Sequence, residues 1–330
     1  MNNRRKLVSV LGASLIAAPF SSFAQQLGKV WRIGYIDFGS HQSLVDSGRD
    51  AALKEGLRER GYVEGKNLVL EERFAEGNSD RLNLLAAELV QKKVALILSQ
   101  GTPASHAAKL ATTTIPIVIV ATTDPVGDGF AKSLARPGGN ITGMSSSAED
   151  TVQKLVELLM VAVPRLARIA VAFNPTSSAH TGLLSRVQES AKKAGKQVLQ
   201  MGVRTPADIE RGIATIVRER GDGMIIFADS FLFSERRRFA ELALKHRLPS
   251  IHALGGYAEV GGLMSYGADI NENFHRAGIF VDKILKGTKP AEIPFEQPAK
   301  FSLQINSTTA KALGVKISQE LLLRADRVIE

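Results

Sequence analysis

The chain has 330 residues, of which 44% are hydrophobic, and its 42 lysines and arginines against 33 aspartates and glutamates give a formal charge of +9. This apolar content excludes a wholly disordered chain, and the length favours two compact lobes over a single core. The absence of cysteine excludes disulfide frameworks, thiolate metal sites and thiol nucleophiles.

The first residues have the pattern of a cleavable export signal. A basic stretch ending at Lys6 precedes an apolar run over 7–20, which is shorter than the roughly 20 residues that a membrane-spanning helix needs. Ser22 and Ala24 are small residues at the positions that a signal peptidase reads. We therefore expect residues 1–24 to be removed and the mature chain to lie in a bacterial periplasm. No cysteine is present to carry a lipid anchor, and the general secretory and twin-arginine routes both remain open.

From residue 30 onward, short apolar runs alternate with amphipathic segments. Each apolar run followed by helical spacing of apolar residues is the pattern of a βα unit. Repeated βα units predict a parallel sheet covered by helices on both faces. In this first series the expected strands are 30–36, 67–73, 94–98 and 115–120, and the expected helices are 44–60, 79–91 and 103–111.

A second series begins after 137–140 (PGGN), where glycine tolerates the positive φ of a tight turn that leads into a crossing strand. The last elements of the chain are too few to form a third lobe, so we expect them to join the two sheets. The sequence thus predicts an α/β protein with two doubly wound parallel-sheet lobes. Expected helices are 148–161, 178–194, 206–219, 234–245 and 271–286, and expected strands are 169–173, 197–201, 224–228, 249–252, 263–266 and 301–305.

Small or hydrogen-bonding residues follow several expected strands. Ligands of open parallel sheets bind beyond the carboxyl ends of strands, where helix N-termini present unpaired N–H groups. The same residue types also form helix N-caps and turns, which is the simpler explanation for any single position. Strand ends from two lobes that converge on one cleft nevertheless favour a ligand site. These ends are 37–40, 99–102, 122–125, 173–175 and 228–230.

Catalytic and metal-binding patterns are absent from the sequence. It has no G-x-S-x-G elbow, no G-x-x-x-x-G-K-[ST] phosphate loop and no H-E-x-x-H helix. Gly127-Asp128-Gly129 begins like a dinucleotide-binding motif, but Lys132 stands where its last glycine belongs. The six histidines include no pair at helical spacing. We therefore expect no metal, no cofactor and no catalytic residues.

Several blocks of the sequence resemble the tryptophan/tyrosine-type ABC transporter substrate-binding proteins. The resemblance covers nearly all of the mature chain, and its block at 133–143 is the most specific. It implies a type I periplasmic binding fold, in which two α/β lobes joined by three crossing segments close on a ligand. It also implies that lobe 1 comprises 30–143 and 266–295 and lobe 2 comprises 144–265 and 300–330. The blocks are 61–68, 111–118, 124–127, 133–143, 265–267, 281–287 and 301–306.

The resemblance and the strand ends together suggest how a small amino-acid-like or carboxylate ligand would bind. Its carboxylate would accept hydrogen bonds at Ser40, Gly101 and Thr102, because helix N-termini favour anions. Its ammonium group would face Asp124 or Asp229. The expected ligand-binding residues are Ser40, Gly101, Thr102, Thr123, Asp124, Asn174, Asp229, Ser230 and Tyr266.

The expected function is that of the periplasmic solute-binding component of an ABC importer, a monomer that works with permease and ATPase subunits. An exported ligand sensor feeding a membrane receptor stays open. An α/β enzyme using the same cleft is the weaker alternative, because no nucleophile or base stands beside an orienting partner. A DNA-binding regulator would need a helix-turn-helix module where the chain has its export signal, so nucleic acid is not an expected partner. The identity of the ligand is left open by the sequence.

Overall fold

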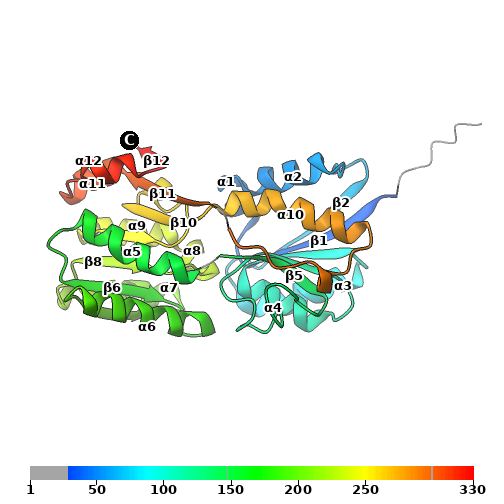
Figure 1. The fold of residues 1–330 in the computed structure, drawn as a ribbon, viewed down its shortest axis with the longest axis horizontal. Coiled ribbons are helices and arrows are strands. Elements are labelled where there is room, and N and C mark those ends of the chain that lie inside the picture. The colour runs from blue at the N-terminus through cyan, green and yellow to red at the C-terminus, as the bar shows by residue number, and fades with distance from the viewer. Residues whose placement is uncertain (1–28, 147, 299) are drawn as a thin grey trace, which may run out of the picture.

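The computed structural model describes residues 29–146, 148–298 and 300–330, which form two α/β lobes side by side along the long axis of the molecule (Figure 1). The predicted export signal, residues 1–24, lies outside the described residues. Among these residues, no helix is both long enough and apolar enough to cross a bilayer.

Lobe 1 is built on a five-stranded sheet. Its elements are β1 (Trp31–Asp37), α1 (His41–Asp46), α2 (Arg49–Glu59), β2 (Leu68–Phe74), η1 (Ser79–Arg81), α3 (Leu82–Gln91), β3 (Leu96–Gln100), α4 (Gly101–Ala111), β4 (Ile117–Thr122) and β5 (Ile141–Ser145), with α10 (Ile270–Leu285) and η3 (Pro290–Glu292) from late in the chain. The strands run parallel in the order β2-β1-β3-β4-β5. Apolar side chains on one face pack against α2 and α10, and those on the other pack against α3 and α4. The predicted doubly wound arrangement is confirmed.

Lobe 2 is built on a seven-stranded sheet in the order β12-β11-β10-β9-β8-β6-β7. Its elements are α5 (Ala148–Ala162), β6 (Arg168–Phe173), α6 (Ser178–Lys193), β7 (Gln197–Gly202), α7 (Pro206–Arg218), β8 (Gly223–Ile226), α8 (Ser230–Ser234), α9 (Arg236–Lys245), β9 (Ser250–His252), η2 (Ala258–Val260), β10 (Met264–Ala268), β11 (Phe301–Asn306), α11 (Ser307–Leu313), α12 (Gln319–Leu323) and β12 (Arg327–Ile329). Core residues of α5 and α6 cover one face of the sheet, and those of α7 and α9 cover the other.

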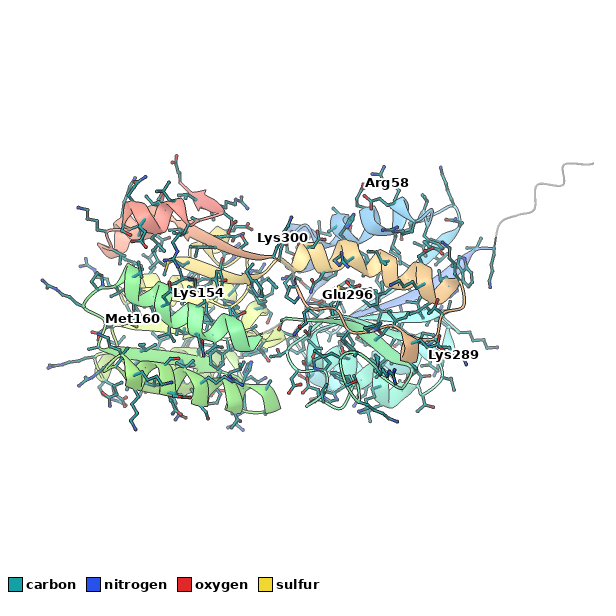
Figure 2. All side chains as sticks on the ribbon, viewed as in Figure 1. Arg58, Lys154, Met160, Lys289, Glu296 and Lys300 are labelled. Carbon is teal, nitrogen blue, oxygen red and sulfur yellow. The ribbon has the colours of Figure 1, made fainter. Side chains whose placement is uncertain are left out.

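The chain passes between the lobes three times: after β5, between β10 and α10, and before β11. Strand β10 lies in the second sheet, so the chain changes lobe after Ala268, slightly later than the expected residue 266. Strand β11 is antiparallel to β10, because the chain returns to lobe 2 at the end where β10 leaves it, with Phe301 opposite Ala268. Figure 2 shows Lys300 on this last passage.

Two of the crossing segments run side by side. The backbone N–H of Glu296 donates to the carbonyl of Gly143 at 2.9 Å, and its carbonyl accepts from the N–H of Ser145 at 2.9 Å. The Glu296 carboxylate also accepts from Arg276 Nε of α10 at 2.9 Å. The segments between the lobes are therefore tied to each other and to lobe 1.

Helix α10 returns to lobe 1 and packs against α2 through a pair of glycines. A Cβ on Gly56 would lie 1.9 Å from the carbonyl oxygen of His275, and a Cβ on Gly278 would lie 2.3 Å from the carbonyl oxygen of Gly56. The two backbones therefore approach closer than any other residue pair would allow. This contact lets Phe274 and Phe280 enter the core of lobe 1.

The expected helix at 44–60 is divided in the structure. Gly48 has φ +73°, which ends α1 and begins α2 at Arg49. Glycine adopts this left-handed conformation with little cost, so the chain can turn sharply here. As a result, Arg49 stands at the start of a new helix beside the cleft. The terminal elements α11, α12 and β12 were not among the predicted ones.

Candidate functional site

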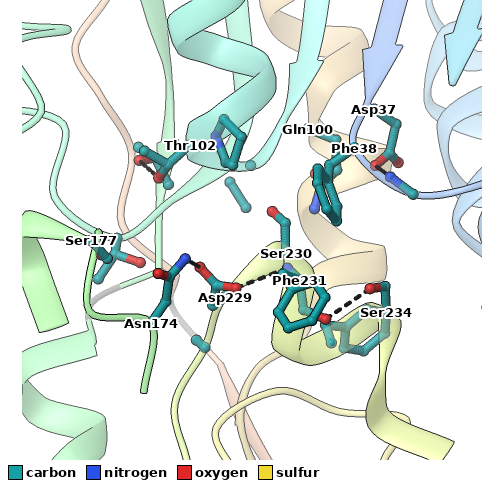
Figure 3. Close-up of a pocket in the computed structure, with 18 of the residues that line it drawn as sticks. Asp37, Phe38, Gln100, Thr102, Asn174, Ser177, Asp229, Ser230, Phe231 and Ser234 are labelled. Atoms are coloured by element: carbon teal, nitrogen blue, oxygen red, sulfur yellow. Dashed lines mark hydrogen bonds between the residues drawn. The ribbon is translucent and has the colours of Figure 1, made fainter. Parts of the chain in front are cut away.

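A cavity of about 860 Å³ lies between the two lobes. Lobe 1 contributes the carboxyl ends of β1, β3 and β4 and the start of α4, and lobe 2 contributes the loops after β6 and β8 and the start of α8 (Figure 3). Six of the predicted site residues line this cavity, and their binding of a ligand stays a prediction. They are Gly101, Thr102, Thr123, Asn174, Asp229 and Ser230.

The other three predicted residues lie outside the cavity walls, contrary to expectation. Ser40 caps α1, its Oγ accepting from the N–H of Ser43 at 3.1 Å. Asp124 closes a turn, its Oδ1 accepting from the N–H of Gly127 at 2.8 Å. Tyr266 lies within β10 and stacks on Phe301 with 6.0 Å between the ring centroids, so its ring packs on the core of lobe 2.

The lobe 1 wall contains a cluster of two hydroxyls and a carboxylate at the start of α4. The hydroxyls of Thr102 and Thr122 lie 3.0 Å apart. Both approach Asp128 Oδ2, at 3.4 Å from Thr102 and 3.3 Å from Thr122. Neither Thr122 nor Asp128 was among the predicted site residues, although the sequence placed Thr122 at a strand end and Asp128 inside an incomplete dinucleotide motif. The cluster places an anionic acceptor beside the unpaired N–H groups of a helix N-terminus.

The lobe 2 wall faces this cluster with a second carboxylate. Asp229 Oδ1 caps α8 by accepting from the N–H of Phe231 at 2.8 Å, and Asp229 Oδ2 accepts from Asn174 Nδ2 at 3.0 Å (Figure 3). The loop is held from behind by His180, whose Nδ1 accepts from the N–H of Asn174 at 2.9 Å and whose Nε2 donates to the carbonyl of Ala228 at 3.1 Å. Burial lowers the pKa of His180, which keeps this ring neutral.

At the other end of the cavity stand two buried, oppositely charged residues. Asp37 is 8% exposed and accepts from the Tyr35 hydroxyl at 2.7 Å and from the N–H of Gly39 at 2.8 Å. Burial raises the pKa of the Asp37 carboxyl. Arg49 is also 8% exposed, and its guanidinium lies 4.2 Å from the ring centroid of Phe233. Burial lowers the pKa of Arg49 to about 10, against the opposing effect of the Asp37 charge.

Neither residue of this pair was chosen from the sequence. Asp37 was visible at a strand end, where Ser40 was preferred because a hydroxyl at a helix start suits an anion. Arg49 gave no signal, since it lay inside an expected helix. Only the turn at Gly48 brings it to the cavity.

Aromatic rings and backbone from the two lobes meet across the middle of the cavity. Phe38 of lobe 1 and Phe231 of lobe 2 pack edge to face with 6.4 Å between centroids. A Cβ on Gly101 of lobe 1 would lie 2.1 Å from Ser230 Oγ of lobe 2. The lobes are therefore in contact with each other across the cavity.

The titratable side chains of the walls include Asp37, Asp128, Asp229 and His106. No cluster of three His, Asp or Glu side chains able to hold a metal occurs in the part of the chain that the structure describes. His106 lines the cavity, but its ring packs on Phe130 at 4.6 Å and no hydrogen bond joins it to a hydroxyl of any described residue. Burial lowers the pKa of His106. The arrangement is suited to holding a small molecule that has polar groups at both ends.

Three comparisons with known proteins point to the same family. The model of the ABC transporter substrate binding protein family matches residues 32–329. A tyrosine-binding protein from Clostridioides difficile (strain R20291) is 28% identical over 284 residues, which are 86% of this chain and 81% of that protein. An ABC domain from Streptococcus pneumonia, crystallised in complex with L-Trp, has a TM-score of 0.84 at 26% identity, covering 91% of this chain and 100% of its own.

A further solved structure is informative about the position of the lobes. The ligand-free, open structure of a substrate-binding protein with adhesive properties from Clostridium difficile has a TM-score of 0.67 at 27% identity, covering 91% of this chain and 99% of its own. Its sequence is as similar as that of the L-Trp complex, yet its overall superposition is poorer. Rotation of one lobe against the other lowers such a score, so the difference agrees with a closed arrangement here. From its two-lobed type I periplasmic binding fold and its match over residues 32–329, this chain belongs to the ABC transporter substrate-binding protein family.

Proposed function

We propose that this chain is the periplasmic solute-binding component of an ABC importer and that it encloses an aromatic amino acid between its lobes. The observation that carries the proposal is the cavity of about 860 Å³, polar at its ends and aromatic at its middle. Its volume falls in the range of small-molecule sites, roughly 300 to 1,000 Å³. The relatives named as tyrosine-binding or crystallised with L-Trp support the same ligand class.

The amino-acid end of the ligand fits the walls around α4. Its carboxylate would lie at the start of α4, accepting hydrogen bonds from the N–H groups there and from Thr102, since helix N-termini and hydroxyls favour anions. Its ammonium would lie between Asp128 and Asp229, one carboxylate from each lobe. The side chain would then extend toward Phe38 and Phe231.

Contacts to both lobes would explain how binding drives closure. A ligand shifts a conformational equilibrium only by its difference in affinity for the two states. Asp128 belongs to lobe 1 and Asp229 to lobe 2, so a single ammonium would join them only when the lobes come together. The closed monomer would then be recognised by the permease, with the ATPase supplying energy. The export signal expected at 1–24 supports a periplasmic location.

Calorimetry on the purified mature chain tests the ligand class. We expect L-tryptophan, L-tyrosine or L-phenylalanine to bind, and a ligand at about 100 times its Kd to raise the free energy of unfolding by about 2.7 kcal/mol. The bound amino acid should be recovered unchanged by mass spectrometry, as expected of a carrier rather than an enzyme. Failure of all three to bind would overturn the proposal, and uptake of the labelled ligand by cells with and without the gene tests the importer role.

A pair of neighbouring aspartates provides a matched test of the site. Asp128→Asn should raise the Kd of the amino acid by about tenfold or more, because it removes a charge that would pair with the ammonium. Asp124→Asn changes the same side chain four residues earlier, in a turn outside the cavity walls, and should leave the Kd within about twofold. Equal effects of the two substitutions in calorimetry would remove Asp128 from the site.

A further inference from the structure

The end of the cavity at Asp37 and Arg49 is not used by the amino-acid end of the ligand. Figure 3 shows Asp37 and Thr102 on opposite sides of the cavity, with Phe38 and Phe231 between them. Both Asp37 and Arg49 line the cavity, although each is more than nine-tenths buried. Protein atoms therefore cover most of both side chains, and both still reach the cavity.

The guanidinium of Arg49 has donors without an acceptor. Among the described residues it makes no hydrogen bond and no ion pair within 4 Å, and its contacts are the rings of Phe233, at 4.2 Å, and Phe274, at 5.9 Å. A guanidinium has five N–H donors. Burying a charged donor without an acceptor is costly, so an acceptor from a bound molecule is the partner that this site lacks.

The carboxylate of Asp37 has room for another donor. Each of its oxygens accepts one hydrogen bond, from the Tyr35 hydroxyl and the Gly39 N–H, whereas an ionised carboxylate offers about four acceptor positions. Asp37 and Arg49 are near enough for each charge to act on the other, yet no ion pair within 4 Å joins them. A small group that both donates and accepts fits between them, and the pair has no net charge with which to attract an ion.

The surroundings of this pair suit an aromatic ring. Leu44, Leu254 and Ile270 line the cavity and belong to, or pack against, the same apolar cluster as Phe274 and Tyr35. A ring that lies among these side chains loses contact with water while its far edge reaches the charged pair.

We propose that Asp37 and Arg49 bind a hydroxyl on the side chain of the ligand, which donates to Asp37 and accepts from Arg49. The pair would thereby select a hydroxylated aromatic amino acid over the same molecule without its hydroxyl. This inference rests on the proposed function and adds the determinant of specificity. L-Tyrosine and L-phenylalanine differ only in this group and are the probes that test it.

Calorimetry with the two amino acids measures the discrimination directly. The wild-type chain should bind L-tyrosine about tenfold or more tightly than L-phenylalanine, because a hydrogen bond to a charged group is lost with the hydroxyl. Arg49→Met should raise the Kd of L-tyrosine by about tenfold and that of L-phenylalanine by less than about threefold. Asp37→Asn should also reduce the preference for L-tyrosine, measured as the Kd of L-phenylalanine divided by the Kd of L-tyrosine.

Arg236→Met is the matched control. The Arg236 guanidinium also lies 4.2 Å from the centroid of Phe233, but Arg236 does not line the cavity. Its removal deletes an equivalent stacking contact and should keep the tyrosine-to-phenylalanine ratio, and thermal unfolding verifies that each variant is folded. Equal affinity of the wild type for both amino acids, or an unchanged ratio in Arg49→Met, overturns this inference and leaves the proposed function standing. If L-tryptophan, L-tyrosine and L-phenylalanine all fail to bind, both proposals fall.

Discussion

At the scale of single residues, His252 is unusual because it is fully buried next to the contact between the lobes. Its Nδ1 accepts from the N–H of Leu254 at 2.9 Å, so the neutral ring carries its proton on Nε2, which has no hydrogen-bond partner. The ring packs near Phe233, with 6.2 Å between centroids. Burial, and then the positive charges of Arg236 and Arg49, lower the pKa of His252 to about 3.

This shift predicts a loss of stability in acid. The pKa of His252 is about 3 in the folded chain and about 6.5 in the unfolded chain, so between these values the unfolded state binds a proton that the folded state does not. The free energy of unfolding should therefore fall, by about 1.4 kcal/mol for each pH unit below about pH 6. Urea unfolding of His252→Asn at pH 7, 6 and 5 should show a smaller fall than the wild type.

Two other histidines, His180 and His246, help to interpret this experiment. His180 is also buried with a lowered pKa, so His252→Asn should keep part of the acid sensitivity. His246→Asn, which removes an imidazole from an exposed position, is the control substitution. If the free energy of unfolding fell equally with pH in His252→Asn and in the wild type, His252 would not be the source of the acid sensitivity.

At the scale of elements, the start of α4 in lobe 1 meets the start of α8 in lobe 2 at Gly101, which has no side chain, and Ser230. Gly101 has φ +78°, and the absence of a Cβ lets Ser230 Oγ come within 2.1 Å of the position that a Cβ would occupy. A Cβ at 101 would occupy the position of Ser230 Oγ, so this hydroxyl would have to turn away before the cleft could close. Gly101 is therefore expected to favour closure through its missing Cβ as well as through its positive φ.

Gly101→Ala should weaken ligand binding, because Ser230 Oγ must move out of the position of the added methyl group when the lobes close. Gly61→Ala is the control, because Gly61 has a similar φ of +85° but nothing within 4 Å of an added Cβ, so it carries the backbone cost of roughly 1 to 2 kcal/mol without the collision. Adding Ser230→Ala to Gly101→Ala removes the colliding oxygen and should restore binding in part. Calorimetry and small-angle scattering report affinity and closure, and equal binding by the two alanine variants would refute the role of the contact.

The order of strands and helices could be predicted from the sequence because each βα unit has its own periodicity, as in β1 followed by α1 and α2. The division at Gly48 could not, since one glycine inside an amphipathic segment is compatible with a continuous helix. The position of Arg49 at the cavity depends on that division. Likewise, Ser40 and Asp124 cap local backbone groups outside the cavity walls, whereas Asp229 caps α8 and also lines the cavity, and the same residue types serve both purposes. Only the folded positions separate them.

At the scale of the whole molecule, lobe 1 depends on a helix from late in the chain. Helix α10 covers one face of the first sheet and meets α2 where Gly56 and Gly278 bring the two backbones together. The first lobe is therefore complete only when the segment after β10 has returned to it. In the same way, the sheet of lobe 2 is completed by β11 and β12 after the last crossing.

Gly278→Ala should destabilise the molecule strongly, because its methyl group would lie 2.3 Å from the carbonyl oxygen of Gly56. Overpacking of this kind typically lowers the free energy of unfolding by about 1 to 3 kcal/mol. Gly182→Ala in α6, where nothing lies within 4 Å of the added Cβ, should instead raise it by roughly 0.5 to 1 kcal/mol. Chemical denaturation measures both, and a stable Gly278→Ala variant would show that α2 and α10 can separate without loss.

The dependence on α10 has a consequence for how the polypeptide comes together after synthesis. A nascent chain that ends at β10 lacks the helix that finishes one half of the protein and the strands that finish the other, so neither half can reach its final form early. Folding is thereby postponed until almost the entire polypeptide is available. Such a delay would suit the general secretory route, one of the two export routes that the sequence leaves open and the one that carries unfolded chains.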